Sequence, residues 1–401
     1  MAGPIALLLM LLALAGCAYL IAAAVLVGRF AARPSPTVPA GEPAPGVTVL
    51  KPLHGAPPGL FDDLSTWCRQ TYPGPLQIVC GVARRDDPAV AVVERLIAAH
   101  PAVRIDLVID PTRHGSNGKV SNLINMAGKI RHGVVVVSDS DIRLRPDDVS
   151  RVVAALRRPG VGAVTCLYGG EGAAGVWSDL VALGLVSHFL PNAVLGLEIG
   201  RANPCFGALI ALDRKTLDAI GGFAAFADTL ADDYAIGAAV RSKGLAVVVP
   251  SVAVLHRCDE TSLAALWAHE LRWARTVMSL DPPGWLGSVV THPLAAALLA
   301  VAFGGGRPAV GLAVAAIVCR IVLAWRVGVA LARPVPALPL VPLRDLLTFA
   351  VFVASFLGRA VTWKDQDFRM RADGTFVETD GAGPDGRKTI AGTTAKGESV
   401  K

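Results

Sequence analysis

Apolar residues are distributed unevenly along the chain, and the two ends carry most of the excess. Residues 5–28 are an Ala- and Leu-rich run without a charge, long enough to cross a bilayer as a helix. From Trp285 onward the chain is again strongly apolar, whereas the centre has the mixed pattern of a globular domain. This pattern predicts a transmembrane anchor at 1–31, a linker at 32–46 and a central domain at 47–282. It also predicts two or three membrane segments at 283–363 and a partly disordered tail at 364–401.

The first apolar run also admits a cleaved signal peptide, because Leu14-Ala-Gly-Cys17 resembles a lipoprotein cleavage site. No Lys or Arg precedes the run, and it continues well past Cys17, which favours a retained anchor. Arg29 and Arg33 follow it, and basic residues beside a span mark the cytoplasmic side. We therefore expect a multi-pass protein of the inner (cytoplasmic) membrane whose central domain faces the cytoplasm.

The C-terminal apolar runs differ in quality. Residues 310–331 are a good span, and 346–361 are a shorter one. The run 289–303 is weaker because His292-Pro293 interrupts it, so a re-entrant segment is one interpretation. The number of spans, and with it the side of the tail, stays open. Two arginines inside the best span are costly in lipid and should face protein, water or a head group: Arg320 and Arg326.

The central part alternates β-rich runs with segments of helical periodicity. Strands and helices are expected in turn at 47–53, 60–70, 77–82, 90–100 and 103–109. Further strands are expected at 134–137, 162–168 and 205–212. Residues 171–200 are apolar with few charges and are interpreted as an amphipathic helix near the membrane surface. The β-α-β-α-β order favours an α/β fold with a parallel sheet covered by helices.

Four consecutive valines at 134–137 are followed by Ser-Asp-Ser-Asp, which places carboxylates at Asp139 and Asp141. Such a run is typical of a strand buried on both faces, and ligands of open α/β sheets bind at the carboxyl ends of strands. Two acidic side chains there need a counter-charge, which a hard divalent cation shared with a diphosphate supplies. The alternative is an acidic turn after a strand, because Asp-x-Asp is short and common.

Other polar residues carry candidate chemistry, each with a plainer alternative. Lys119 enters a predicted helix from a Gly-containing loop, which fits either an anion cradle or one solvated lysine. Asp232-Asp233 opens another helix, where capping accounts for one carboxylate and the second is free to accept a proton. His188 is a site residue or, like most lone histidines, structural. Arg272-Trp273 joins a cation to a flat ring, which also suits an interfacial anchor.

Composition narrows the class of partner. The chain has 401 residues and a net charge of +6, and its mean hydropathy of +0.52 is too high for an ordinary soluble enzyme. It has no stripe of basic and aromatic residues, so we expect no nucleic acid partner. The seven cysteines are scattered without a C-x-x-C pair, which favours reduced thiols over a zinc site or a disulfide framework.

The order of these motifs resembles the processive-type family of inverting glycosyltransferases with the GT-A nucleotide-sugar fold, and within it the ceramide glucosyltransferase branch. The shared features cover most of 47–280 and are Leu50-Lys-Pro-Leu53, Asp86-Asp-Pro88, Lys119-Val-Ser-Asn122, Asp139-Ser-Asp-Ile142, Ser187-His188, Gly221-Gly-Phe223, Asp232-Asp-Tyr234 and Arg272-Trp273. Two longer segments are similar to the bacterial hopanoid-biosynthesis branch, Lys119-Val-Ser-Asn-Leu-Ile-Asn125 and His269-Glu-Leu-Arg-Trp-Ala-Arg275. The family motif usually begins with Gln or Arg where this chain has His269, which leaves the role of His269 open.

The resemblance implies a GT-A domain between an N-terminal transmembrane helix and C-terminal transmembrane helices. It implies a UDP-sugar donor, Mg²⁺ or Mn²⁺, and a membrane lipid acceptor in the bilayer; the hopanoid branch implies N-acetylglucosamine transfer to bacteriohopanetetrol. The implied donor-binding residues are Lys51, Asp86, Asp87, Lys119, Asn122, Asp139 and His188, and the implied metal ligands are Asp139 and Asp141. The implied catalytic group is Asp233 as general base with Asp232, Arg272 at the diphosphate and Trp273 at the acceptor.

Two other classes of protein stay open. One is an enzyme with another acceptor, such as ceramide with UDP-glucose, diacylglycerol or a growing polysaccharide. A polysaccharide synthase needs enough spans to build a channel, and this chain has few. The other is a membrane scaffold that binds a nucleotide sugar without catalysis, but such a scaffold has no use for Asp233.

Overall fold

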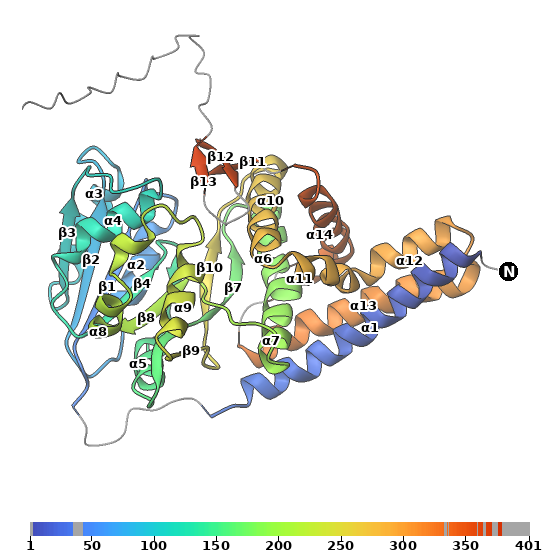
Figure 1. Cartoon of the computed structure of the whole chain (residues 1–401), viewed down its shortest axis with the longest axis horizontal. Helices are drawn as coiled ribbons and strands as arrows, with labels where there is room; N and C mark the ends of the chain where they lie inside the picture. The colour runs from blue at the N-terminus through green and yellow to red at the C-terminus, as the bar shows by residue number, and fades with distance from the viewer. Residues whose placement is uncertain are drawn as a thin grey trace, which may run out of the picture.

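The computed structural model of the protein describes residues 3–34, 43–332, 335, 337–358, 360–363, 366–370 and 376–378. An α/β body and a helical arm that extends away from it make up the described chain (Figure 1). Much of the predicted linker at 32–46 and most of the predicted tail at 364–401 lie outside the described residues.

The body is built on a seven-stranded sheet. Its strands are β1 Val47–Pro52, β2 Leu76–Val82, β3 Arg104–Ile109, β4 Val134–Ser138, β6 Val161–Thr165, β8 Leu209–Asp213 and β9 Ala246–Val248. They follow the order β3-β2-β1-β4-β8-β6-β9. The first four are parallel, as predicted, but β8 runs antiparallel to both β4 and β6, so the sheet is mixed. The carboxyl ends of β1, β2 and β4 meet at one edge.

The valine run in β4 is buried on both faces of the sheet, which confirms the prediction. Because successive side chains of a strand point to opposite faces, Val134 and Val136 join one hydrophobic cluster while Val135 and Val137 join another. None of the four is more than 3% exposed. One face is covered by α2 Leu60–Cys68, α3 Ala89–Ala99 and α5 Asp148–Leu156, and the other by α4 Gly118–Ala127, α8 Arg214–Ala219 and α9 Asp232–Ser242.

A second sheet adjoins the first and has three strands. They are β5 Ile142–Arg143, β7 Leu167–Gly172 and β10 Ala253–Cys258, in the order β5-β10-β7. The single strand predicted at 162–168 is wrong, because the chain changes sheets at Cys166 and forms β6 and then β7. The predicted strand at 205–212 is shorter than expected, since β8 begins at Leu209.

The predicted surface helix at 171–200 is also wrong in part. Glu171 belongs to β7, and the helical part consists of α6 Val176–Gly184, a π-helical turn Leu185–Phe189 and α7 Leu190–Glu198. In its most apolar 18-residue window, 67% of the segment is buried inside the protein. The segment is apolar because it packs between the second sheet and the arm, through Leu180 and Val186 among others.

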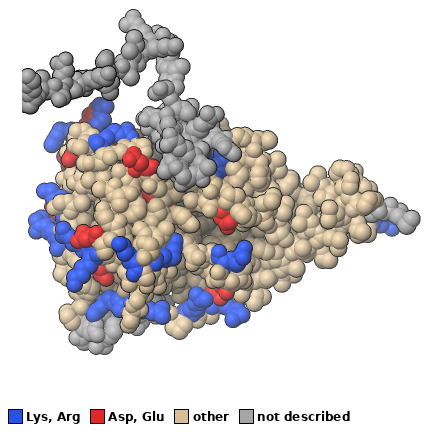
Figure 2. All heavy atoms as spheres, viewed as in Figure 1, with Lys and Arg blue, Asp and Glu red and all other residues tan. Residues whose placement is uncertain are grey.

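The arm contains α1 Pro4–Ala31, α12 Pro293–Ala302, α13 Gly306–Ala330 and α14 Val341–Ser355. On the face in Figure 2, charged side chains gather over the body and the adjoining end of the arm, and the rest of the arm is almost free of them except at its tip. By length and composition, four helices of the described chain qualify as membrane spans: α1, α13, 176–198 and 338–355. A bent pair, 282–291 with 293–302, makes a fifth if it counts as one span, and its 66° bend fits the predicted re-entrant segment.

The remaining elements complete the described chain, and the first 3₁₀ helix among them packs in the body between α8 and α9. They are α10 Leu263–Leu280, α11 Pro282–Gly287, the 3₁₀ helices Phe223–Phe226, Ser288–Thr291 and Leu338–Leu340, and the antiparallel strands β11 Ala360–Trp363, β12 Gln366–Met370 and β13 Phe376–Glu378. The predicted span at 346–361 is shifted, because its helix begins earlier and ends at Ser355. Arg320 is fully buried against protein, as expected for an arginine inside a span.

Candidate active site

A cavity of about 660 Å³ opens where the carboxyl ends of β1, β2 and β4 face the second sheet and α10. Most predicted site residues line it, namely Lys119, Asn122, Asp139, Asp141, Asp232, Asp233, Arg272 and Trp273. Four predicted site residues of the described chain do not line it, namely Lys51, Asp86, Asp87 and His188. Distant parts of the sequence therefore converge here, as the motifs predicted, but the predicted donor-binding set divides into two groups.

The two carboxylates after β4 have different partners. Asp139 Oδ1 lies 2.7 Å from Lys119 Nζ, and Asp141 Oδ2 lies 3.2 Å from His256 Nε2. Asp141 Oδ1 is buried and accepts no hydrogen bond from any described residue. A buried carboxylate oxygen without a donor suits a hard cation. His256 and the carboxylate keep opposite charges, since Asp141 raises the pKa of His256 well above its usual value although burial alone would lower it.

Lys51 supports this loop from beneath and does not face the cavity. Its ammonium donates to Ser138 Oγ at 3.1 Å and to the Asp139 carbonyl at 2.6 Å, and it lies 4.2 Å from the centre of the Trp67 ring. Burial lowers its pKa to about 7, against the raising effects of Asp141 and Asp139. The prediction that Lys51 contacts the uridine end therefore conflicts with its position, because a fully buried ammonium cannot reach a ligand.

Asp86 and Asp87 also stay outside the cavity. Asp86 is 67% exposed and pairs with Arg84. The Asp87 carboxylate accepts from the backbone N–H groups of Gly55 at 3.0 Å and of Ala89 at 2.8 Å. Asp87 thus fixes the loop after β1, and through that loop it acts on the rim of the cavity rather than on its interior.

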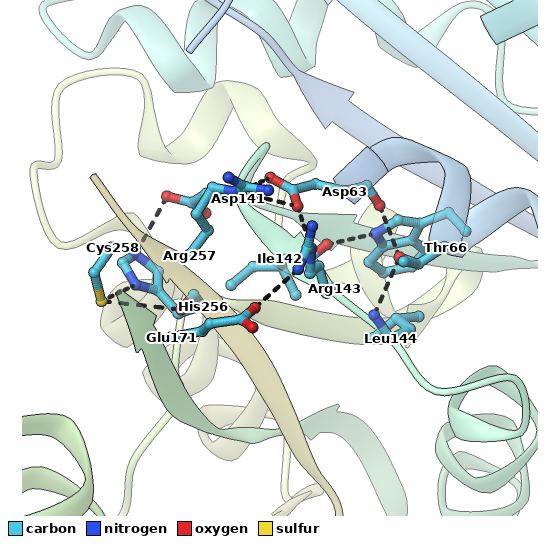
Figure 3. A network of polar contacts seen from close by, with 11 residues as sticks. Asp63, Thr66, Asp141, Ile142, Arg143, Leu144, Glu171, His256, Arg257 and Cys258 are labelled. Atoms are coloured by element: carbon cyan, nitrogen blue, oxygen red, sulfur yellow. Dashed lines mark hydrogen bonds and ion pairs between the residues drawn. The ribbon is translucent and has the colours of Figure 1, made fainter. Parts of the chain in front are cut away.

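Behind the Asp141 loop, a polar network joins α2 to the second sheet (Figure 3). The Asp63 carboxylate is 2% exposed and accepts from Arg143 and, at 3.1 Å, from Arg257 Nε. Arg143 also pairs with Glu171 at 2.8 Å. Because each arginine is held by a carboxylate, β5 just after Asp141 and β10 beside it are fixed before any ligand binds, which favours binding.

Lys119 and Asn122 lie at the start of α4. The helix begins there because Asn117 Oδ1 accepts from the N–H groups of Lys119 and Val120, a side-chain cap. Lys119 Nζ stands between Asp139 and Asp232, 3.6 Å from the latter. Burial alone would lower the pKa of Lys119, but the two carboxylates raise it above its usual value. Lys119 is thus a fixed cation of the cavity rather than a solvated side chain.

Asp233 is held at the start of α9 by two backbone donors. Its Oδ2 accepts from Gly207 N at 2.8 Å, and its Oδ1 accepts from Tyr234 N at 2.8 Å. A Cβ at position 207 would lie 3.1 Å from Oδ2, so a glycine there permits this close approach. Burial and the neighbouring Asp232 raise the pKa of Asp233 to about 6, against the lowering effect of Lys119. A carboxylate with this pKa is suited to accept a proton near neutral pH.

Helix α10 forms the wall nearest the arm. Arg272 lies on the cavity, and no carboxylate of the described chain lies within ion-pair distance of it. Burial lowers its pKa, and Tyr168 and Asp139 oppose that effect. The Trp273 ring packs edge-on against His269 at 4.4 Å. On the same helix Glu270 binds Arg344 of α14 through two parallel hydrogen bonds, one of them 2.6 Å long. Because Arg272 is an unpaired cation at the cavity wall, it suits an anionic ligand.

His188 lies in a separate buried group of charges, which we call the arm cluster: His188, His292, Arg320 and Asp345. His188 Nε2 lies 2.7 Å from Asp345 Oδ1, and Arg320 Nε lies 2.9 Å from the same oxygen. The rings of His188 and His292 stack with centres 6.1 Å apart. His188 occupies the π-helical turn and contacts the arm, so the prediction that it binds the donor conflicts with its position.

Two residues that sequence reasoning missed lie on the cavity. His256 pairs with Asp141, and Tyr168 packs between the rings of Phe189 and Trp273 at 4.4 and 6.3 Å. Both come from the second sheet, where β7 pairs with β10. In the sequence, each of these two residues is only a polar residue in a short β-rich run. That pattern does not reveal which other strand the residue will lie beside.

Comparisons with known proteins place these features in context. The sequence profile of Glycosyl transferase family 21 matches residues 8–376. Ceramide glucosyltransferase 1 of Caenorhabditis elegans is 24% identical over 251 residues, 62% of this chain and 52% of that protein. Ceramide glucosyltransferase of Komagataella phaffii is 31% identical over 126 residues, 30% of this chain and 25% of that protein. The chain thus spans about half the length, or less, of these curated relatives.

A solved structure gives a similar comparison. A mannosyltransferase from Pyrobaculum calidifontis in complex with GDP-Man and Mn²⁺ aligns with 87% of this chain and 99% of its own, at 21% identity and a TM-score of 0.49. The mixed sheet of this chain, with an Asp-x-Asp loop at the end of a central parallel strand, defines a GT-A-type α/β fold with apolar helices at both ends. Because the family profile covers most of its length, the chain belongs to glycosyl transferase family 21.

Proposed function

We propose that the protein is a membrane-bound inverting glycosyltransferase that moves a sugar from a UDP-sugar to a hydroxyl group of a membrane lipid. One observation carries the proposal: Asp139, Asp233 and Arg272, from three distant segments, open onto one cavity beside the arm. The family membership supports the same reaction class. The domain is proposed to face the cytoplasm at the inner membrane, because Arg29 in the last turn of α1 and Arg33 just after the helix lie at the end that leads to the body.

The favoured acceptor is bacteriohopanetetrol, with N-acetylglucosamine as the sugar, because the segments 119–125 and 269–275 are similar to the hopanoid branch. The second candidate is glucosylation of ceramide from UDP-glucose. The names of the two relatives support it, since both are ceramide glucosyltransferases. Both candidates require an acceptor hydroxyl presented at the bilayer surface, and α10, which forms one wall of the cavity, packs against α14 of the arm.

A divalent cation fits the cavity as a partner of the diphosphate. Asp139 and Asp141 would hold Mg²⁺ or Mn²⁺, and the buried, unpaired Oδ1 of Asp141 supports this. Among the described residues no group of three or more His, Cys, Asp or Glu side chains is arranged as a metal site. The ion would therefore take its remaining ligands from phosphate and water, as Mg²⁺ commonly does. When bound, it neutralises charge on the leaving group.

The chain's own residues account for the remaining steps. Arg272 donates hydrogen bonds to the diphosphate and so steadies the charge that develops on UDP. Asp233 accepts the proton of the acceptor hydroxyl. At the same time the hydroxyl oxygen of the acceptor bonds to the anomeric carbon, and the bond from that carbon to UDP breaks. Attack from the face opposite UDP inverts the anomeric centre. Gly207 N–H and Tyr234 N–H hold the Asp233 carboxylate in place for this transfer.

The decisive variant is Asp233→Asn, which keeps the size of the side chain and removes its basicity. We expect transfer to fall by roughly 10²–10⁴-fold, while binding of the UDP-sugar persists. Asp218→Asn, at an exposed position of α8, is the matched control and should keep full activity. UDP release from membranes, measured with added bacteriohopanetetrol, with ceramide and with neither lipid, distinguishes the two acceptors.

Two results would contradict the proposal. Near-normal turnover of the Asp233→Asn protein would remove the base assignment. Binding of the UDP-sugar without lipid-dependent UDP release, under every acceptor tested, would favour a scaffold that binds but does not catalyse. Loss of Mn²⁺ stimulation in Asp139→Ala, with Asp218→Ala as control, tests the cation separately.

A further inference from the structure

A groove of about 570 Å³ runs between α1 and α13 on the arm, away from the cavity of the body. Its walls are apolar side chains that point outward, and four of them are 49–58% exposed, namely Ile21, Val25, Val318 and Val322. Both helices are long and apolar enough to cross a membrane. Side chains of this kind on two such helices meet lipid chains, which are as apolar as the side chains themselves.

One end of the groove is positively charged. Arg29 of α1 and Arg326 of α13 both line it, together with Trp325, which is 55% exposed. Position 28 is a glycine, and a Cβ there would lie 2.6 Å from Arg326 Nη2. The absence of a side chain at Gly28 therefore lets the Arg326 guanidinium lie against α1, next to Arg29. An exposed tryptophan at the end of a span is typical of the membrane interface.

Arg29 and Arg326 differ in their partners from the other arginines near the same end of the arm. Arg33 pairs with Glu198 at 2.6 Å, and Arg145 donates to the carbonyls of Leu331 at 2.8 Å and Ala332 at 2.6 Å. Arg29 and Arg326 are exposed, and neither makes a hydrogen bond or ion pair with another residue of the described ranges. Both cations line this end of the groove without a carboxylate among the described residues to neutralise them, so this end is complementary to an anion.

We propose that the groove binds one anionic glycerophospholipid, with an acyl chain along the apolar walls and the phosphate between Arg29 and Arg326. Guanidinium groups match phosphate oxygens in pairs of hydrogen bonds. A zwitterionic lipid presents the same phosphate but adds a cationic choline, which the two arginines disfavour. The site is independent of the sugar-transfer cavity, so this proposal stands or falls without the proposed function.

The test uses the purified full-length protein in detergent, titrated with dioleoylphosphatidylglycerol or dioleoylphosphatidylcholine and observed by native mass spectrometry. We expect the anionic lipid to bind at least about tenfold more tightly than the zwitterionic one. The double variant Arg29→Gln/Arg326→Gln should lose this preference. Arg69→Gln/Arg307→Gln removes the same charge at exposed positions outside the groove and should keep it.

A second variant separates the acyl chain from the head group. Val322→Trp leaves both arginines in place but fills the groove, so it should also lose the bound anionic lipid. Displacement of the lipid by soluble glycerol phosphate would show a head-group site alone and would overturn the proposal. Equal binding of the two lipids by the natural protein, or full retention of the anionic lipid by either groove variant, would overturn it as well.

Discussion

The cavity of the body and the arm cluster contain the same kinds of side chain in opposite circumstances. In the cavity, Arg272 has no carboxylate partner among the described residues, and Asp141 Oδ1 has no donor. In the arm cluster, Arg320 is fully buried and shares the Asp345 carboxylate with His188. Charges that face open space can bind a ligand, whereas charges that neutralise one another join helices. Burial and residue type alone do not separate the two roles.

The largest expected effect concerns stability and falls on the arm cluster. Asp345→Leu would leave Arg320 and His188 buried without their carboxylate, and loss of one partner of a buried pair costs roughly 3–5 kcal/mol. We expect the free energy of unfolding of the detergent-solubilised protein to fall by about this amount. Asp218→Leu, at an exposed position, should change it little. A stable Asp345→Leu protein that no longer binds the donor would instead support the original prediction that His188 belongs to the donor site.

The second effect concerns activity and falls on the cavity. Arg272→Gln removes the cation that we propose binds the diphosphate, and loss of one such donor is expected to lower kcat by roughly 10²–10³-fold. The melting temperature should stay unchanged, because Arg272 has no ion-pair partner among the described residues to lose. Arg69→Gln is the matched control. If Arg272→Gln lowered stability and activity together, the two regions would not differ as described.

The smallest effect is a shift in the pH profile. Because Asp233 is proposed to act as the base and its pKa is raised to about 6, kcat/KM should be flat above that pH and fall about tenfold per pH unit below it. The charged groups around it are Asp232, Lys119 and Asp139. Asp232 raises the pKa of Asp233, so Asp232→Asn should move the acid limb to lower pH. If the acid limb of the Asp232→Asn protein were unchanged, the limb would report the titration of a group other than Asp233.

The sequence predicted the parallel half of the sheet and the cavity residues that belong to recognisable motifs. The valine run reveals a strand buried on two faces, and Asp139, Asp233 and Arg272 follow from motifs whose place in the fold is regular. Lys51 was misjudged because its motif gives the residue type but not the direction of the side chain, which points under the loop toward Trp67. His256 was missed because only the antiparallel pairing of β10 with β5 brings it to Asp141.

Helix α10 begins beside the body and ends against the arm, and this continuity limits how the protein can be divided. Glu270 binds Arg344 of α14, and two residues later Arg272 faces the cavity. An excised fragment that stops at residue 282 would leave Glu270 without its partner Arg344. Helix α10, which carries Arg272, would then no longer be held against α14. We expect such a fragment to bind UDP more weakly than the intact protein in isothermal titration; equal affinities would mean that the body alone positions α10.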